Sequence, residues 1–168
     1  MSIGKTFEND FKLSLRSAGH WAERFRDNTY QSRMRGVASQ SSPPDMVAVI
    51  NGKPCLIELK AIRVRSELQG GSIPLSKLSE NQHNHLRNFE NQGYPFVAVM
   101  FYEGQRAVNR AAVMIPYWYW TQYESAKGRK SLKLSDLCLD VRPNYHFKWV
   151  GRASEVGPWK SKEKIIIP

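Results

Sequence analysis

The sequence has little of several features that mark particular classes of protein. It has two cysteines in 168 residues, Cys55 and Cys138, which form neither a disulfide framework nor a Cys-x-x-Cys metal clip. The longest apolar run, at 94–102, is about nine residues long and too short to cross a bilayer as a helix. The first residues lack the apolar core of a signal peptide. We therefore expect a soluble, cytoplasmic protein with no membrane partner.

Acidic residues are also scarce. Fifteen Asp and Glu stand against 25 Lys and Arg, which gives a net charge of +10 and a pI near 9.8. This excess favours a nucleic-acid partner, because bound phosphates release their condensed counterions. Charge alone leaves open a basic protein that binds nothing, or one associated with the ribosome. The other fractions, 41% hydrophobic and 24% charged, are typical of a globular chain, and the length suits one domain.

Apolar spacing and turn residues predict the elements of the first half. In segment 6–18 the apolar residues recur at steps of four, four and three, which predicts a helix with one stripe: Phe7, Phe11, Leu15 and Ala18. Alternation over 20–25 predicts a short strand, and the polar segment 27–42 predicts a loop. Segments 46–50 and 54–61 predict a hairpin, because Asn51-Gly52 between them accepts the positive φ values of a tight turn.

The second half continues as an alternation of helices and strands. Segment 79–91 predicts a helix with a capping box of Ser79 and Gln82, and 117–120 predicts a short helix. Segments 94–102 and 107–115 predict strands, of which the first is nearly all apolar and expected at the centre of the sheet. From Ser125 onward the elements are weakly marked, although ten of the 25 basic residues lie there. The order indicates an α/β protein with helices on the faces of a sheet.

Acidic and basic side chains converge on the predicted hairpin. Asp45 precedes its first strand, and Glu58 and Lys60 share one face of its second strand. A suitable register brings Asp45 beside them. Two carboxylates can hold Mg²⁺, which lowers the pKa of a bound water and neutralises charge growing on a phosphodiester. Lys60 can hold the scissile phosphate and orient that water.

An acid two residues before a lysine carries little information by itself. Asp10-Phe11-Lys12 has the same spacing, but it lies in a predicted helix, where residues i and i+2 point apart. The alternative without chemistry is a turn-forming Asp45 and a same-face ion pair of Glu58 and Lys60. Apolar neighbours on both sides of Glu58 favour the site, because a buried acid needs a partner or a metal.

At these residues the sequence resembles the PD-(D/E)xK nuclease superfamily, as Pro44-Asp45 followed by Glu58-Leu59-Lys60. Within it, the likeness is to Holliday junction resolvases of the archaeal Hjc and bacterial RecU type. The resemblance implies a restriction-endonuclease-like fold, with a central mixed β-sheet flanked by helices. We expect a single nuclease domain over 1–168, with a catalytic core at about 4–115 and a C-terminal extension of unknown role at about 116–168. The aromatic segment around Trp118 is expected in the core or at a dimer contact.

The resemblance adds one acid to the site. Gly4, Lys5 and Glu8 look like part of the family's first helix, whose Glu joins the metal site. Glu8 would then bind Mg²⁺ together with Asp45 and Glu58, and Mn²⁺ would substitute. The alternative is that Glu8 is a solvated helix residue.

The resemblance also adds an amide. Residues 73–75, followed by 78–82, resemble the RecU-type segment that leads into a helix with an active-site Gln, and Gln82 holds that place. The alternative is that Gln82 only completes the capping box with Ser79.

The polar loop before Pro44 resembles the DNA-contacting loop of these resolvases. Hjc-type enzymes use a loop Ser there, for which Ser39, Ser41 and Ser42 all compete. Other basic residues are candidate phosphate contacts on either side of the site, although charged runs are usually solvated surface: Lys5, Arg33, Arg35, Arg63 and Arg65.

These features predict a homodimeric, metal-dependent endonuclease that recognises the shape of branched double-stranded DNA. Each subunit would nick one of two opposed strands of a four-way junction, because a dimer with two-fold symmetry matches the two-fold symmetry of the junction. The alternatives are another endonuclease with the same core (restriction-like, nicking or repair) and a non-catalytic basic DNA-binding protein. We expect it on the nucleoid, or in the host cytoplasm if a virus encodes it.

Overall fold

The computed structural model describes residues 2–25, 43–65, 67–104, 109–126, 128–150 and 158–168. The predicted loop at 27–42 lies outside these residues, together with Arg33, Arg35 and the three candidate serines.

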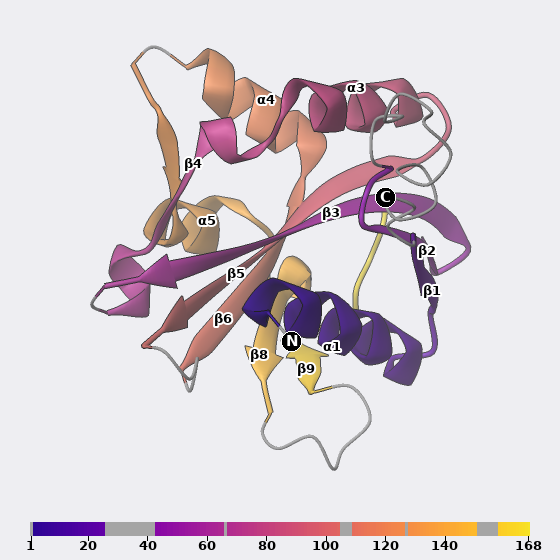
Figure 1. The fold of residues 1–168 in the computed structure, drawn as a ribbon. Helices are drawn as coiled ribbons and strands as arrows, with labels where there is room; N and C mark the ends of the chain where they lie inside the picture. Colours follow the sequence, from indigo (N-terminus) through magenta and orange to yellow (C-terminus); the bar gives the residue numbers. More distant parts are fainter. Residues whose placement is uncertain (1, 26–42, 66, 105–108, 127, 151–157) are drawn as a thin grey trace, which may run out of the picture.

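A mixed sheet of seven strands forms the centre of the protein, in the order β1-β2-β3-β5-β6-β8-β9 (Figure 1). Strands β3 and β5 pair in parallel and the other neighbours are antiparallel. This confirms the mixed α/β fold class. The strands are β1 (Trp21–Arg24), β2 (Met46–Ile50), β3 (Lys53–Val64), β5 (Tyr94–Glu103), β6 (Arg110–Pro116), β8 (His146–Trp149) and β9 (Trp159–Ser161).

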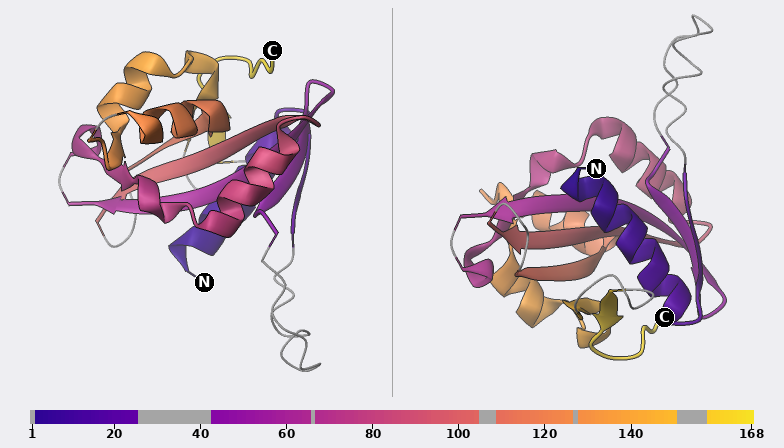
Figure 2. Two further views of the ribbon diagram at one scale, coloured as in Figure 1. Left: turned by 90° about the horizontal axis from the view of Figure 1, so that it is seen from above. Right: turned by 60° about the horizontal axis from the view of Figure 1, so that its bottom comes forward.

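Helices flank the sheet, with α1 on one face and α3 and α4 on the other (Figure 2). The helices are α1 (Ile3–Ser17), α3 (Glu80–Phe89), α4 (Tyr117–Ser125) and α5 (Leu134–Asp140), and the 3-10 turns are η1 (Leu68–Gly70), η2 (Leu75–Lys77) and η3 (Pro143–Tyr145). A small second sheet pairs β4 (Ser72–Pro74) with β7 (Ser131–Lys133). No helix in the described ranges is both long and apolar enough to span a bilayer.

Helix α1 begins earlier and ends earlier than its pattern predicts. Ser2 caps it, because its hydroxyl accepts a hydrogen bond from the backbone N–H of Lys5 at 3.4 Å. Phe7, Phe11 and Leu15 are buried as predicted. Ala18 was wrongly placed in the stripe: it lies exposed after the last turn.

The hairpin prediction is confirmed in detail. Asn51 and Gly52 have φ values of 52° and 76°, and this two-residue turn pairs Ile50 with Lys53. Strand β3 runs past the predicted end at residue 61, because its parallel pairing with β5 continues to Val64. Strand β5 is central as expected, with Phe96–Phe101 at most 2% exposed.

Helix α4 and the C-terminal strands were only partly foreseen. Tyr117 and Trp120 are buried in the core, whereas Trp118 is 61% exposed. The chain after residue 125 adds β8 to the edge of β6 and β9 to the edge of β8. Phe147 of β8 packs edge-on against Phe11 of α1, with ring centroids 4.9 Å apart. The C-terminal segment is thus continuous with the central sheet.

Candidate active site

Strand pairing places Asp45 opposite Glu58. Met46 pairs with Ile57 in the antiparallel register of β2 and β3, so the preceding residue, Asp45, faces Glu58 on the same side. Lys60 lies two residues further along that face, and its Nζ donates to Glu58 Oε1 at 2.8 Å. The three residues predicted from the sequence therefore meet at one place.

Asp45 also ends the pairing between the two strands. Its Oδ2 accepts a hydrogen bond of 2.8 Å from the backbone N–H of Leu59. The carboxylate thus takes the place that a backbone carbonyl of a longer β2 would occupy. The result is a notch in the sheet, where β3 continues and β2 has ended.

Gln82 joins the site from the first turn of α3. Its Oε1 accepts from Lys60 Nζ at 3.0 Å and from the backbone N–H of Ser79 at 3.0 Å. Its Nε2 donates to Glu58 Oε1. Ser79 Oγ in turn accepts from the backbone N–H of Gln82 at 3.4 Å, which completes the capping box. One amide therefore caps the helix and contacts the acid and the lysine together.

Glu58 is an acid whose environment disfavours the charged form. It is 2% exposed, and its pKa is raised to about 7, chiefly by burial. The Asp45 carboxylate and a hydrogen bond with it also act to raise that pKa, whereas the ammonium of Lys60 acts to lower it. Buried Glu58 and half-buried Asp45 together offer oxygen ligands to a divalent cation, which would take the place of the proton that Glu58 holds up to about neutral pH.

Glu8 lies on the other side of the sheet. Its partner Arg24 pairs with Met46, whose side chain points to the face opposite Asp45, whereas Gln82 contacts Glu58 on the face of Asp45. The carboxylate of Glu8 accepts a hydrogen bond from Arg24 Nη2 in β1, and Arg24 Nη1 donates to Asn9 Oδ1 at 2.7 Å. Within the described ranges, no three His, Cys, Asp or Glu side chains are grouped as a metal site requires. In this conformation Glu8 is therefore held by Arg24.

Arg24 is a residue of this region that sequence reasoning missed. Its backbone pairs with Met46, and the next residue, Phe25, donates its N–H to the Asp45 carbonyl at 3.1 Å. Arg24 thus links Glu8 to the strand that carries Asp45. A lone arginine in an alternating strand carries no signal that marks such a role, since only the pairing of β1 with β2 places it there.

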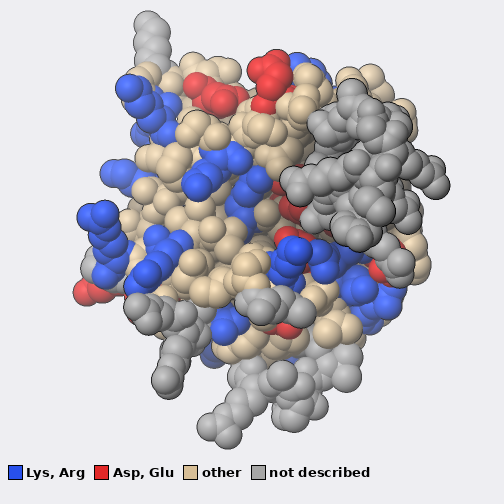
Figure 3. All heavy atoms as spheres, in the orientation of Figure 1, with Lys and Arg blue, Asp and Glu red and all other residues tan. Residues whose placement is uncertain are grey.

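The predicted DNA contacts that can be placed are all exposed. Lys5 lies on α1 one turn before Glu8, and Arg63 and Arg65 lie at the far end of β3, where they line a cavity of about 420 Å³ with Val64 and Gly104. Alternation along β3 sends Arg63 to the face opposite Lys60. Lys and Arg are spread widely over the face in Figure 3, and Asp and Glu are few there. The roles of these residues in DNA binding stay predictions.

A scan against models of protein families finds no match, and a search of curated proteins finds none. Among solved structures, the protein is similar to Hjc of Archaeoglobus fulgidus, a Holliday junction resolvase from an archaeal hyperthermophile. The match has a TM-score of 0.53 and 22% sequence identity, and it covers 81% of this chain and 93% of that one. The two proteins share a fold. The restriction-endonuclease-like architecture expected from the sequence is thereby confirmed.

Proposed function

We propose that this protein is a divalent-metal-dependent endodeoxyribonuclease that resolves four-way DNA junctions. The observation that carries the proposal is the carboxyl pair of half-buried Asp45 and buried Glu58, which meets Lys60 and Gln82 beside the notch between β2 and β3. The fold shared with the Archaeoglobus resolvase supports the choice of DNA substrate, as does the net charge of +10. Because one fold can host many functions, the proposal depends on the side chains of the site and their geometry.

Asp45 and Glu58 would hold the cation, Mg²⁺ by preference and Mn²⁺ in its place. Glu8 would join them if its side chain leaves Arg24 and reaches past the end of β2 to their face of the sheet. The bound cation supplies an acidified water and neutralises charge on the phosphate. Side chains of the protein would position the phosphate and the water relative to each other. The ammonium of Lys60 is fixed between Glu58 and Gln82, where it would hold the scissile phosphate and orient the attacking water.

Gln82 acts as a positioning residue in this scheme. Its amide nitrogen contacts Glu58 and its oxygen contacts Lys60, so it fixes both side chains relative to a rigid helix terminus. Through the capping box, the position of the amide is coupled to the first turn of α3.

The pairing of cuts belongs to the same proposal. A homodimer would place two such sites on opposed strands of one junction and produce symmetric nicks. It would recognise branch shape through phosphates, with Lys5, Arg33, Arg35, Arg63 and Arg65 as candidate contacts. Such an enzyme would work in the cytoplasm, on the nucleoid or on viral DNA.

A cleavage assay with a synthetic four-way junction and a linear duplex of the same sequence tests the proposal. With Mg²⁺ we expect paired symmetric nicks in the junction and little cutting of the duplex. Asp45→Asn and Glu58→Gln should abolish cutting while junction binding persists. Asp10→Asn is the matched control, because Asp10 has the same spacing from a lysine as Glu58 but lies on α1.

Three results would point elsewhere. Equal cutting of both substrates would indicate a general endonuclease with the same core. Binding without cutting, and without carboxylate-dependent Mn²⁺ binding by electron paramagnetic resonance, would indicate a non-catalytic DNA-binding protein. Cutting that survives in both variants would mean that the site is wrong.

A further inference from the structure

A pocket lined by lysine residues lies at the other end of the β2–β3 hairpin, away from the carboxyl pair. It is a cavity of about 810 Å³ between the end of α1, the Asn51-Gly52 turn and the C-terminal segment after β9. Five residues of β2 separate Asp45 from this turn, which corresponds to about 17 Å along the strand. None of the residues assigned to cleavage lines it.

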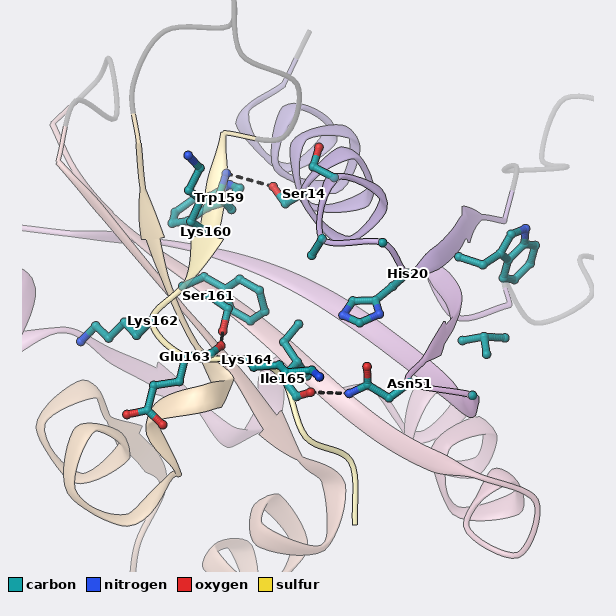
Figure 4. A pocket seen from close by; sticks show the side chains of 17 residues that line it. Ser14, His20, Asn51, Trp159, Lys160, Ser161, Lys162, Glu163, Lys164 and Ile165 are labelled. Carbon is teal, nitrogen blue, oxygen red and sulfur yellow. Dashed lines mark hydrogen bonds between the residues drawn. The ribbon is translucent and has the colours of Figure 1, made fainter.

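Hydrogen bonds fasten the walls of this pocket to one another. The backbone N–H of Trp159 donates to the buried Ser14 Oγ at 2.9 Å, which ties β9 to α1. On the other side, Asn51 Nδ2 donates to the carbonyl of Ile165, which ties the C-terminal segment to the hairpin turn. Figure 4 shows both contacts on the rim of the cavity. The walls of the pocket are therefore fixed by hydrogen bonds between elements that are distant in the sequence.

The lining is rich in positive charge. Lys160, Lys162 and Lys164 all line the pocket, and Glu163 is the acidic member among the described lining residues. In Figure 4 the carboxylate of Glu163 points away from the cavity, as does Lys162. His20 points into the cavity toward Lys164. Burial and the charge of Lys164 both lower the pKa of His20, which agrees with an imidazole placed close to the ammonium.

Two facing nitrogen groups, both able to donate hydrogen bonds, are suited to an anion. An anion between His20 and Lys164 would accept a hydrogen bond from each and would stabilise the protonated form of His20 that Lys164 alone disfavours. Trp21 also contributes to the lining, but its indole is 52% exposed on the outer side of β1, because Ala22, the next residue, is the one that faces the core.

We infer that this pocket binds a phosphate group of a DNA strand between His20 and Lys164, at a site separate from the cutting centre. The DNA part of this inference rests on the proposed function. A DNA strand in a duplex carries one phosphate per about 3.4 Å, so the path of about 17 Å along β2 corresponds to about five nucleotides from the carboxyl pair. A strand leaving the cutting centre would thus reach the pocket within the same junction arm.

Nuclear magnetic resonance of the four histidine rings tests the phosphate site without metal or cleavage. The probes are thymidine 5′-monophosphate and, as its uncharged counterpart, thymidine. We expect the nucleotide to shift the His20 signals and to raise the pKa of His20, while thymidine leaves that pKa unchanged. In Lys164→Gln the rise should disappear. The inference would be overturned if the nucleotide left the His20 signals and pKa unchanged, or if it changed them equally in Lys164→Gln.

Junction binding provides the second measurement. At about 0.1 M salt, Lys164→Gln should weaken binding about five- to tenfold and lower the slope of log K against log salt by roughly 0.7–0.9. Lys133→Gln is the matched control, because Lys133 is an exposed lysine on β7 that does not line the pocket. At saturating junction the cutting rate should stay unchanged. Equal weakening in both variants would show general surface charge only and would contradict a specific site.

The two proposals can fail separately. If His20 responds to the nucleotide but the protein never cuts a junction, the proposed function fails and the phosphate site stands. If cutting depends on Asp45 while neither His20 nor Lys164→Gln shows an effect, the pocket inference fails and the proposed function stands.

Discussion

The carboxylate of Asp45 accepts a hydrogen bond of 2.8 Å from the backbone N–H of Leu59, at the point where β2 stops and β3 continues. The same side chain therefore does two things: it satisfies a backbone donor that has lost its strand partner, and it faces Glu58. Asp45 therefore has a structural role, through its hydrogen bond to Leu59, and a proposed chemical role, through its position opposite Glu58. The two roles can be separated by substitution.

Asp45→Asn should keep the fold and lose the chemistry. The amide oxygen can still accept from Leu59, whereas Asp45→Ala leaves that donor unpaired at a cost of about 1–3 kcal/mol. We expect Asp45→Asn to unfold in urea at the wild-type midpoint or above, because the repulsion between Asp45 and Glu58 is removed. Asp45→Ala should unfold at lower urea. Equal midpoints for the two variants would show that the bond to Leu59 contributes nothing measurable.

The stability of the metal-free protein should fall as the pH rises from about 4.5 to about 7. The pKa of Glu58 is raised from 4.5 to about 7 in the folded state, so over this window the unfolded chain loses a proton that the folded chain retains. The loss reaches at most about 3 kcal/mol and then levels off. Urea unfolding at several pH values measures it.

Glu58→Gln is the control for this pH dependence. The variant resembles the protonated acid, so its unfolding free energy should lack the decrease between pH 4.5 and 7 and exceed that of the wild type at pH 8. Parallel curves for the two proteins would show that Glu58 titrates normally.

Gln82 should matter more for cutting than the other half of its capping box. Ser79→Ala removes a helix cap and should destabilise the protein by about 0.5–2 kcal/mol, with cutting within a few-fold of wild type. Gln82→Ala also frees Glu58 and Lys60, and should lower the cutting rate by roughly 10–100-fold, as loss of a positioning group does. The comparison is made on junction DNA at saturating Mg²⁺. If the two variants lose the same activity, Gln82 serves only the helix cap.

Mg²⁺ should stabilise the folded protein through the carboxyl pair. At tenfold its Kd, a ligand of the native state adds about 1.4 kcal/mol, which raises the Tm of a chain of this size by roughly 3–6 °C. Asp45→Asn should remove this shift at pH 8. Glu8→Gln separates the two places proposed for Glu8: it leaves the shift intact if Glu8 stays with Arg24, and reduces it if Glu8 joins the metal. The contradicting result is a full shift in Asp45→Asn.

Much of the site could be predicted because its central part is local. The Asn51-Gly52 turn connects two adjacent strands, and a two-residue turn fixes their register, so Asp45 and Glu58 meet as a consequence of short-range geometry. The capping box of Ser79 and Gln82 is equally local. Ala18 was misplaced for the same kind of reason: apolar spacing continues past the last turn, but the backbone ends the helix at Ser17.

Other parts depend on packing between distant segments. The contact of Gln82 with Lys60 requires α3 to lie on one particular face of β3, and no residue near Gln82 encodes that face. The pairing of Glu8 with Arg24 requires β1 to add to β2 beside the end of α1. Neither arrangement has a periodic or turn signal in the sequence.

By itself, the sequence determined the hairpin, the capping box of Ser79 and Gln82, the buried central strand and the convergence of Asp45, Glu58 and Lys60. These features follow from turn geometry, side-chain alternation and apolar periodicity, which act over a few neighbouring residues. Only the tertiary structure decided that Gln82 completes the site, that Arg24 holds Glu8, and that the C-terminal segment closes a basic pocket over His20. These contacts depend on how helices and strands distant in the sequence pack against one another, and that packing is determined by all the core contacts together.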